Sequence, residues 1–188
     1  ALGIPANCVV EDDSTPDNTG NAFTCRLRDA LELAIAQSTD SRIVFDSSVT
    51  EVVLSTTLNI ASPHGVDING PVVSGVPQVT IRPVSSGFTG SISYCDANGY
   101  ALIGIYSPNV RIAGLSIVGS SGNGIQIVSD STSFLPDSPH NVTIENNFIG
   151  TNTRSGVSGS QANQGHGICA QALDRDFDNT LIRGNIIV

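Results

Sequence analysis

The chain of 188 residues carries a formal net charge of −9, and all eight of its basic residues are arginine. Such a charge repels phosphate backbones and anionic lipid surfaces, so we expect no nucleic-acid partner. No apolar run reaches the roughly 18 residues of a membrane helix, so we expect no membrane span. The 19 glycines, with aromatic residues at only 5%, favour a β architecture with many turns over a helical bundle.

The N-terminal segment holds two of the four cysteines, Cys8 and Cys25, on either side of an acidic, turn-rich stretch. No two cysteines have the CxxC spacing of a zinc or thioredoxin motif, so disulfides in an oxidising compartment are favoured. We predict a Cys8–Cys25 bridge, which leaves Cys95 and Cys169 to pair by elimination. The sequence begins with alanine instead of methionine, which fits a removed signal peptide and a secreted or cell-surface protein.

One amphipathic helix is predicted over 25–37, in the stretch TCRLRDALELAIAQ. Leu27, Leu31 and Ile35 recur at a spacing of i, i+4 and form one apolar stripe. The hydroxyl of Thr24 is expected to cap the first turn.

Short β-rich segments follow, separated by Gly, Pro, Ser, Asn and Asp residues that favour turns. The predicted strands are RIVF (42–45), EVVLSTTLNI (51–60), GVDINGP (65–71), VTIRPV (79–84) and ALIGIY (101–106). They lead into a ten-residue phrase that occurs three times.

The phrase begins at Asn109, Asn141 and Asn179, and it reads NVRIAGLSIV, NVTIENNFIG and NTLIRGNIIV. Isoleucine occupies the fourth and ninth positions of every copy. Alternate residues of a strand point to opposite faces, so one set forms an apolar core and the other faces outward. The predicted core ladder consists of Val66, Ile68, Val110, Ile112, Ile117, Val142, Ile144, Ile149, Ile182 and Ile187.

A single copy cannot bury its apolar face, but copies stacked about 4.8 Å apart form a continuous core and a parallel ladder. The sequence therefore predicts an all-β parallel β-helix of about four to five coils. We assign residues 1–40 to an N-terminal cap of disulfide loop and helix, which protects one end of the stack. Residues 41–188 form the coils, which are open at the C-terminal end.

The outward positions become neighbours when the copies stack. Glu145 should lie beside Arg183 as an exposed pair worth about 0.5 kcal/mol. Asn147 and Asn185 should stack and bond each other's amides. Leu181 interrupts the polar outward set and needs a cover.

Two stretches resemble a known family. TCRLRDALELA followed by RIVFD is similar to the N-terminal segment, commonly written CSLREAI, of secreted bacterial right-handed parallel β-helix repeat proteins. NNFIGTNTRSGVSGSQANQGHGI resembles their repeat of the type N-x-I-G-T-D-x-T-G … G-N-G-x-G-I. Arg26 stands where the family usually has Ser, and Asn152 where it often has Asp. The resemblance covers nearly the whole chain and implies a right-handed β-helix and export, but no defined activity.

The motif GHG at 165–167 raises the question of catalysis, because polygalacturonases combine GHG with NTD, DD and R-x-K on the same type of fold. Here Arg154 replaces the first Asp, no DD precedes GHG, and the chain has no lysine. Inverting hydrolysis needs two carboxyl groups spaced to hold a water molecule. His166 is therefore interpreted as a turn residue that repeats Asn123 of the earlier GNGI.

Asp174, Asp176 and Asp178 alternate in DRDFD and could bind Ca²⁺ through oxygen ligands. Arg175 lies within this run, however, and a solvated loop is favoured. We expect no metal or other cofactor.

The expected function is that of an exported, non-catalytic structural or adhesive module, and whether the chain is an enzyme stays open, leaning no. The alternative is a carbohydrate-active enzyme, a polysaccharide lyase or polygalacturonase-like hydrolase on acidic polysaccharide. A phage or viral fibre would need trimer-forming surfaces, which the sequence does not reveal.

The last copy of the phrase has no cap after it. Either further coils of a longer chain follow, or a second copy adds end to end into a filament by strand addition. The predicted assembly edge consists of Asn179, Leu181, Ile182, Asn185, Ile186, Ile187 and Val188.

Overall fold

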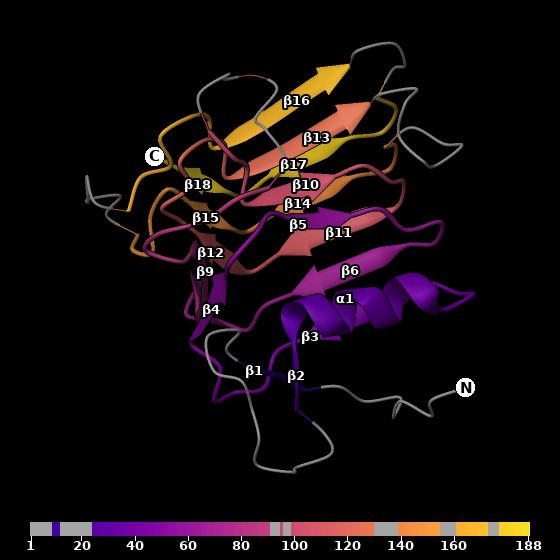
Figure 1. Cartoon of the computed structure of the whole chain (residues 1–188), viewed down its shortest axis with the longest axis horizontal. Coiled ribbons are helices and arrows are strands. Elements are labelled where there is room, and N and C mark those ends of the chain that lie inside the picture. The colour runs from indigo at the N-terminus through magenta and orange to yellow at the C-terminus, as the bar shows by residue number, and fades with distance from the viewer. Residues whose placement is uncertain are drawn as a thin grey trace.

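The computed structural model describes residues 9–11, 24–90, 95, 99–129, 139–154, 161–172 and 177–188, with side chains from Arg26 onward. It is built mostly of β-strands in parallel sheets, with one short helix among the described residues (Figure 1).

Three parallel sheets make up the body, and we number them by the order in which the chain reaches them. The first sheet contains, in spatial order, β3 (Ser41–Val44), β6 (Val66–Asn69), β11 (Val110–Ala113), β14 (Thr143–Glu145) and β17 (Leu181–Arg183). The second contains β4 (Glu51–Leu54), β9 (Val79–Pro83), β12 (Leu115–Ile117), β15 (Phe148–Ile149) and β18 (Ile186–Ile187). The third contains β5 (Leu58–Ile60), β10 (Ile103–Ile105), β13 (Ile125–Ser129) and β16 (Ile168–Ala172).

The chain passes through the three sheets in turn, so that each strand pairs with the strand of the same sheet from the turns before and after. In Figure 1 the strands of the three sheets rise from α1 in the lower part of the molecule toward β16 at the top. The register is set by the repeated phrase, since Ile112 pairs with Ile68 on one side and with Ile144 on the other. Isoleucines thereby stack on isoleucines through the core.

Helix α1 (Leu27–Ala36) lies against the N-terminal end of the stack and shares one core cluster with β3 and its neighbours (Figure 1). Its buried face consists of Leu27, Ala30, Leu31 and Ala34. Arg28 anchors the helix further by donating to the backbone oxygen of Thr56 at 2.9 Å. The predicted cap at Thr24 is wrong, because that residue belongs to β2 (Thr24–Arg26), which pairs with β1 (Val9–Glu11). Asp29 instead accepts from the backbone N–H of Arg26 at the helix start.

One predicted strand and one copy of the repeated phrase are each divided in the structure. The run 51–60 forms β4 and β5, which belong to different sheets, because the chain turns a corner between them. The phrase that begins at Asn109 is divided into β11 and β12 at Gly114, whose φ is +67°. A small antiparallel hairpin of β7 (Val72–Val73) and β8 (Val76–Pro77) was not predicted.

Candidate functional site

The outer edges of β16, β17 and β18 have no pairing strand among the residues that the structure describes. On β17, the N–H of Leu181 donates to Val142, and the oxygen of Arg183 accepts from Asn146. Ile182 lies between them, and the alternation of strand hydrogen bonding directs its N–H and C=O toward the open edge. This edge therefore has the backbone groups that strand addition requires.

All seven residues of the predicted assembly edge lie on this last turn. Leu181, Ile182, Ile187 and Val188 are 42%, 45%, 50% and 51% exposed, Asn179 is exposed, and Asn185 and Ile186 are half-buried.

Two members of the predicted core ladder, Ile182 and Ile187, differ from expectation because they are exposed instead of buried. The physical reason is that they belong to β17 and β18, whose outer edges no described strand covers. The other eight predicted core residues are fully buried or nearly so: Val66, Ile68, Val110, Ile112, Ile117, Val142, Ile144 and Ile149.

The outward face of the first sheet carries charged residues of alternating sign, Arg42, Asp67, Arg111, Glu145 and Arg183, one from each strand; we call this set the charge ladder. The nitrogen–oxygen distance is 3.2 Å from Arg42 to Asp67, and Asp67 lies 2.8 Å from Arg111. Glu145 lies 2.7 Å from Arg111 on one side and 2.7 Å from Arg183 on the other. The ladder therefore links all five strands of the sheet.

The ladder does not follow one column of the register. Arg111 pairs in register with Asp67 and Thr143, whereas Glu145 lies in the adjacent column, opposite Ala113. Arg111 reaches diagonally across to Glu145, with its Nε 2.8 Å from Oε1 of the carboxylate. The glutamate is thus covered by two arginines and only 6% exposed.

This arrangement sets the ionisation of Glu145. Hydrogen bonds from Arg183 and then from Arg111 hold the pKa of its carboxyl below the ordinary value, and they outweigh the opposing effect of burial. The pKa of Arg111 is raised, because its hydrogen bonds to Asp67 and Glu145 outweigh desolvation. Both groups stay charged at neutral pH and stabilise each other.

Asparagines form two further ladders at the corners of the first sheet. Asn109, Asn141 and Asn179 have φ of +57°, +53° and +54°, a conformation that Asn tolerates better than most residues. Asn141 donates to the side-chain oxygen of Asn109 at 2.9 Å, and Asn179 donates to that of Asn141 at 3.1 Å. The sequence showed these three residues in one frame, but the ladder between them was not predicted.

The predicted contact of Asn147 with Asn185 is present, with Nδ2 of Asn147 donating to Oδ1 of Asn185 at 3.1 Å. Each side chain also donates to a backbone carbonyl of the preceding turn, Asn147 to Ile112 and Asn185 to Ile144. In addition, Oδ1 of Asn147 accepts from the backbone N–H of Leu115. Asn147 therefore binds the turns on either side of its own.

Cys95 and Cys169 form a disulfide with their Cα atoms 6.1 Å apart, which joins β16 to a segment before β10. The predicted Cys8–Cys25 bridge lies outside the residues whose side chains are described. Asp174 and Asp176 of the suggested calcium site also lie outside the described residues, and Asp178 is exposed. Within the described ranges, no group of His, Cys, Asp or Glu side chains is arranged to hold a metal ion.

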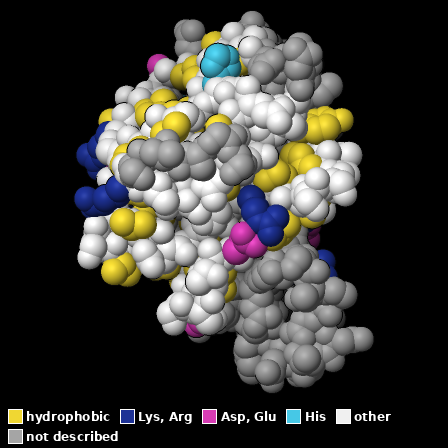
Figure 2. Space-filling model, turned by 90° about the vertical axis from the view of Figure 1, so that its left-hand side faces the viewer, with side chains coloured by type: hydrophobic (Ala, Val, Ile, Leu, Met, Phe, Trp, Pro, Cys, Tyr) yellow, Lys and Arg dark blue, Asp and Glu magenta, His cyan; other side chains and the backbone are white. Residues whose placement is uncertain are grey.

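The second sheet presents a different surface. In Figure 2, which faces this side, charged side chains are sparse and apolar ones are scattered among polar atoms. An open pocket of about 380 Å³ lies on it, lined by Glu51, Thr80, Arg82, Pro83, Val84, Ser85, Val118, Gly119, Asn152 and Gln161.

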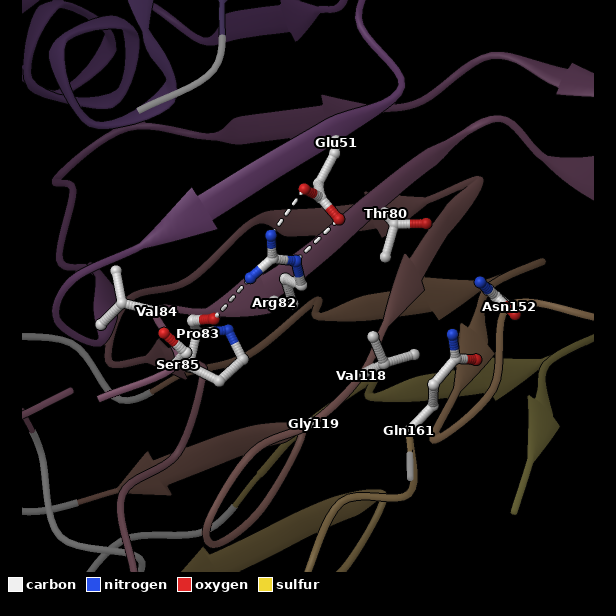
Figure 3. A pocket seen from close by; sticks show the side chains of 10 residues that line it. All are labelled: Glu51, Thr80, Arg82, Pro83, Val84, Ser85, Val118, Gly119, Asn152 and Gln161. Carbon is white, nitrogen blue, oxygen red and sulfur yellow. Dashed lines mark hydrogen bonds and ion pairs between the residues drawn. The ribbon is translucent and has the colours of Figure 1, made fainter. Parts of the chain in front are cut away.

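In Figure 3 the guanidinium of Arg82 points at the carboxylate of Glu51, while the amides of Asn152 and Gln161 lie on the other side of the pocket. Arg82 holds the two carboxylate oxygens at 2.7 and 2.8 Å. Glu51 is the only acidic residue in this lining, so the pocket offers hydrogen bonds but not a pair of carboxyl groups.

The GHG motif belongs to a turn. The backbone N–H of His166 donates to Oδ1 of Asn123 at 2.9 Å, so the two repeated phrases GNG and GHG are directly bonded. His166 is exposed. Arg154, at the position of the first Asp of the NTD motif, donates to the backbone oxygen of Ser74 at 2.6 Å in the β7–β8 hairpin. His166 and Arg154 therefore make separate contacts, His166 through its backbone N–H and Arg154 through its guanidinium.

Among the described residues, α1 is the one α-helix, and its ten residues are too few to cross a membrane. No family model, curated protein or solved structure matches the chain. The resemblance to β-helix repeat proteins accordingly stays an expectation.

Proposed function

We propose that this protein is an exported structural or adhesive module built on a right-handed parallel β-helix. Three parallel sheets that the chain visits in turn, with like residues stacked in register, support a coiled arrangement. The Cys95–Cys169 disulfide suits an oxidising compartment outside the cytosol.

The charge ladder is the observation that carries a non-catalytic role. General acid–base catalysis and polysaccharide cleavage need ionisable groups that are available to substrate. On the first sheet, Asp67 and Glu145 are instead held between arginines of neighbouring turns. Their charges serve to join turns, which is what a long, rigid scaffold requires.

A second candidate, a carbohydrate-active protein on acidic polysaccharide, is favoured by the open pocket on the second sheet. Thr80, Asn152 and Gln161 could bond sugar hydroxyls, and Arg82 could bind a uronate carboxylate. The single carboxylate, Glu51, is already paired with Arg82, so this pocket suits binding more than hydrolysis.

Incubation with uronate polymers, followed by assays for unsaturated products and for new reducing ends, tests the proposal. We expect no turnover above that of a heat-treated sample. Turnover that is lost in Glu51→Gln or Arg82→Gln would overturn the non-catalytic role and favour the second candidate. The variant Asp46→Asn serves as the control, because Asp46 lies outside the pocket lining.

A further inference from the structure

We propose that the pocket on the second sheet binds a neutral, polyhydroxylated ligand, a hexose unit that carries no carboxylate. This rests on the proposed function, because it identifies what an adhesive module would hold. The pocket is built by β4, β9 and the segments that follow β12 and β15, and its lining contains no residue of β17 or β18. Its volume of about 380 Å³ lies at the small end of the range of ligand pockets, roughly 300 to 1,000 Å³, and suits one or two sugar rings.

One wall of the pocket consists of an ion pair whose charges cancel. Arg82 donates to the two carboxylate oxygens of Glu51 at 2.7 and 2.8 Å, and also to the backbone oxygen of Pro83 at 3.2 Å. Glu51 and Arg82 are the only charged residues in the lining. An anionic ligand would have to displace Glu51 from the guanidinium or lie beside its carboxylate, and either arrangement selects against it. The net charge of −9 on the chain adds to this repulsion.

The opposite wall presents two amides, those of Asn152 and Gln161, on a backbone that hydrogen bonds hold in place. The backbone N–H of Gly119 donates to the backbone oxygen of Gln161 at 2.9 Å, which ties this wall to the preceding turn of the stack. Beside Asn152, the hydroxyl of Thr151 accepts from the backbone N–H of Thr153 at 3.1 Å. Because these segments are already fixed, a ligand that binds the amides does not have to order the backbone that carries them.

The remaining lining matches a sugar ring in two ways. Thr80, opposite Glu51 in the strand register, adds a hydroxyl, and Pro83, Val118 and Gly119 add apolar surface for the C–H groups of the ring. In Figure 3, Thr80 and Val118 lie between the ion pair and the two amides. The polar groups are a mixture of donors and acceptors, and sugar hydroxyls can satisfy both kinds, whereas an ionised carboxylate or phosphate only accepts. The lining therefore favours a neutral sugar over a uronate.

Titration of the full chain with neutral sugars, followed by two-dimensional NMR of the amide signals, tests this inference. The probes are cellohexaose, mannohexaose and galactohexaose, together with free glucose, mannose and galactose. We expect at least one of them to bind with a Kd in the millimolar range or below and to shift the signals of the Gly119 N–H and the Asn152 side chain. A hexasaccharide that binds much more tightly than its hexose identifies a unit of a glycan chain as the ligand, and equal binding identifies a free sugar.

Variants on the two walls assign the binding to this pocket. Thr80→Val removes the hydroxyl, keeps the shape of the side chain and should weaken binding about fivefold. Thr143→Val is the matched control, because Thr143 is also a half-buried threonine at an outward strand position but lies on β14, outside the lining. Its affinity should equal that of the unchanged chain. On the opposite wall, Asn152→Ala should also weaken binding about fivefold.

Hexagalacturonate measures the selectivity against charged sugars. We expect it not to bind the unchanged chain and to bind Glu51→Gln in a salt-sensitive way, because Arg82 has then lost this carboxylate. Three results would overturn the inference: hexagalacturonate binding the unchanged chain as tightly as any neutral probe, no shift at the pocket with any neutral probe, or equal losses in Thr80→Val and Thr143→Val. The proposed function fails on a different result, turnover of uronate polymers, which ligand binding alone does not produce.

Discussion

Oε2 of Glu145 lies 2.7 Å from Nε of Arg183, on the next strand of the first sheet, and the glutamate is only 6% exposed. A pair of this kind differs from an ordinary surface ion pair, because the carboxylate is covered and has a second arginine, Arg111, on its other side. Removing the charge would leave two arginines without their common partner in a partly desolvated place.

Glu145→Gln should therefore lower the free energy of unfolding by about 2 to 4 kcal/mol. Denaturation in urea, followed by circular dichroism, measures the change. Glu51→Gln is the matched control, because Glu51 also binds an arginine through two oxygens but is 41% exposed. There we expect a loss of about 1 kcal/mol or less. Equal losses in the two variants would contradict the role assigned to burial.

Stability should also depend on pH through Glu145. Its folded pKa is lowered by Arg183 and Arg111 from the ordinary value of 4.5, so the folded state prefers the ionised form. The resulting stabilisation is fully present above that ordinary value and is lost as the pH falls through the lowered folded pKa. The difference in unfolding free energy between the native chain and Glu145→Gln should shrink over this acidic range. A difference that does not change with pH would contradict the assignment.

Asn147→Ala should cost about 3 kcal/mol, because it removes the partners of the buried Leu115 N–H and Ile112 C=O together. Thermal or urea unfolding measures the loss. Asn179→Gly is the comparison, since it removes an exposed rung of the other ladder while keeping a residue that accepts positive φ. Its cost should stay below about 1 kcal/mol. A larger loss at Asn179 than at Asn147 would reverse the ranking that the contacts imply.

Gly114→Ala should be much worse than Gly87→Ala, although both glycines have positive φ, +67° and +77°. A Cβ at Gly114 would lie 2.5 Å from the backbone oxygen of Gly70, whereas one at Gly87 would meet nothing within 4 Å. Both variants carry a strain of about 1 kcal/mol, and the clash should add roughly 1 to 3 kcal/mol at Gly114. The yield of folded protein and the urea midpoint separate the two.

Replacing both Cys95 and Cys169 by serine should destabilise the protein by about 4 kcal/mol, because the bridge closes a loop of 74 residues. The urea midpoint of the double variant measures this, and reduction of the native chain gives an independent comparison. A midpoint that does not move would contradict the expected restriction of the unfolded chain by the bridge.

The strands and their stacking could be predicted because the repeated phrase fixes which residues face inward. Ile112 and Ile144 stand in register where the alignment placed them. The pair Glu145–Arg183 was predicted on the same basis, but its burial was not. The strand register places Ala113 of the preceding turn opposite Glu145. It does not predict that Arg111, in the adjacent column, also reaches the Glu145 carboxylate.

Other features could not be predicted from the repeated sequence pattern, because the pattern does not specify local backbone geometry. The run 51–60 has no Gly, Pro, Asn or Asp between β4 and β5, so only Ser55 marks the corner between them. The hairpin of β7 and β8 turns at Ser74 and Gly75, both with positive φ, and Ser-Gly was a turn signal that could have found it. For the Asn109 ladder, the recurrence of asparagine was visible in the sequence. The positive φ of these asparagines explains why the same residue type recurs there.

The rungs of the Asn109–Asn141–Asn179 ladder are separated by 32 and then by 38 residues, yet they stack in the same way. Chain length between rungs is therefore decoupled from the geometry of the rungs themselves. Segments between strands can therefore differ in length from turn to turn without disturbing the register.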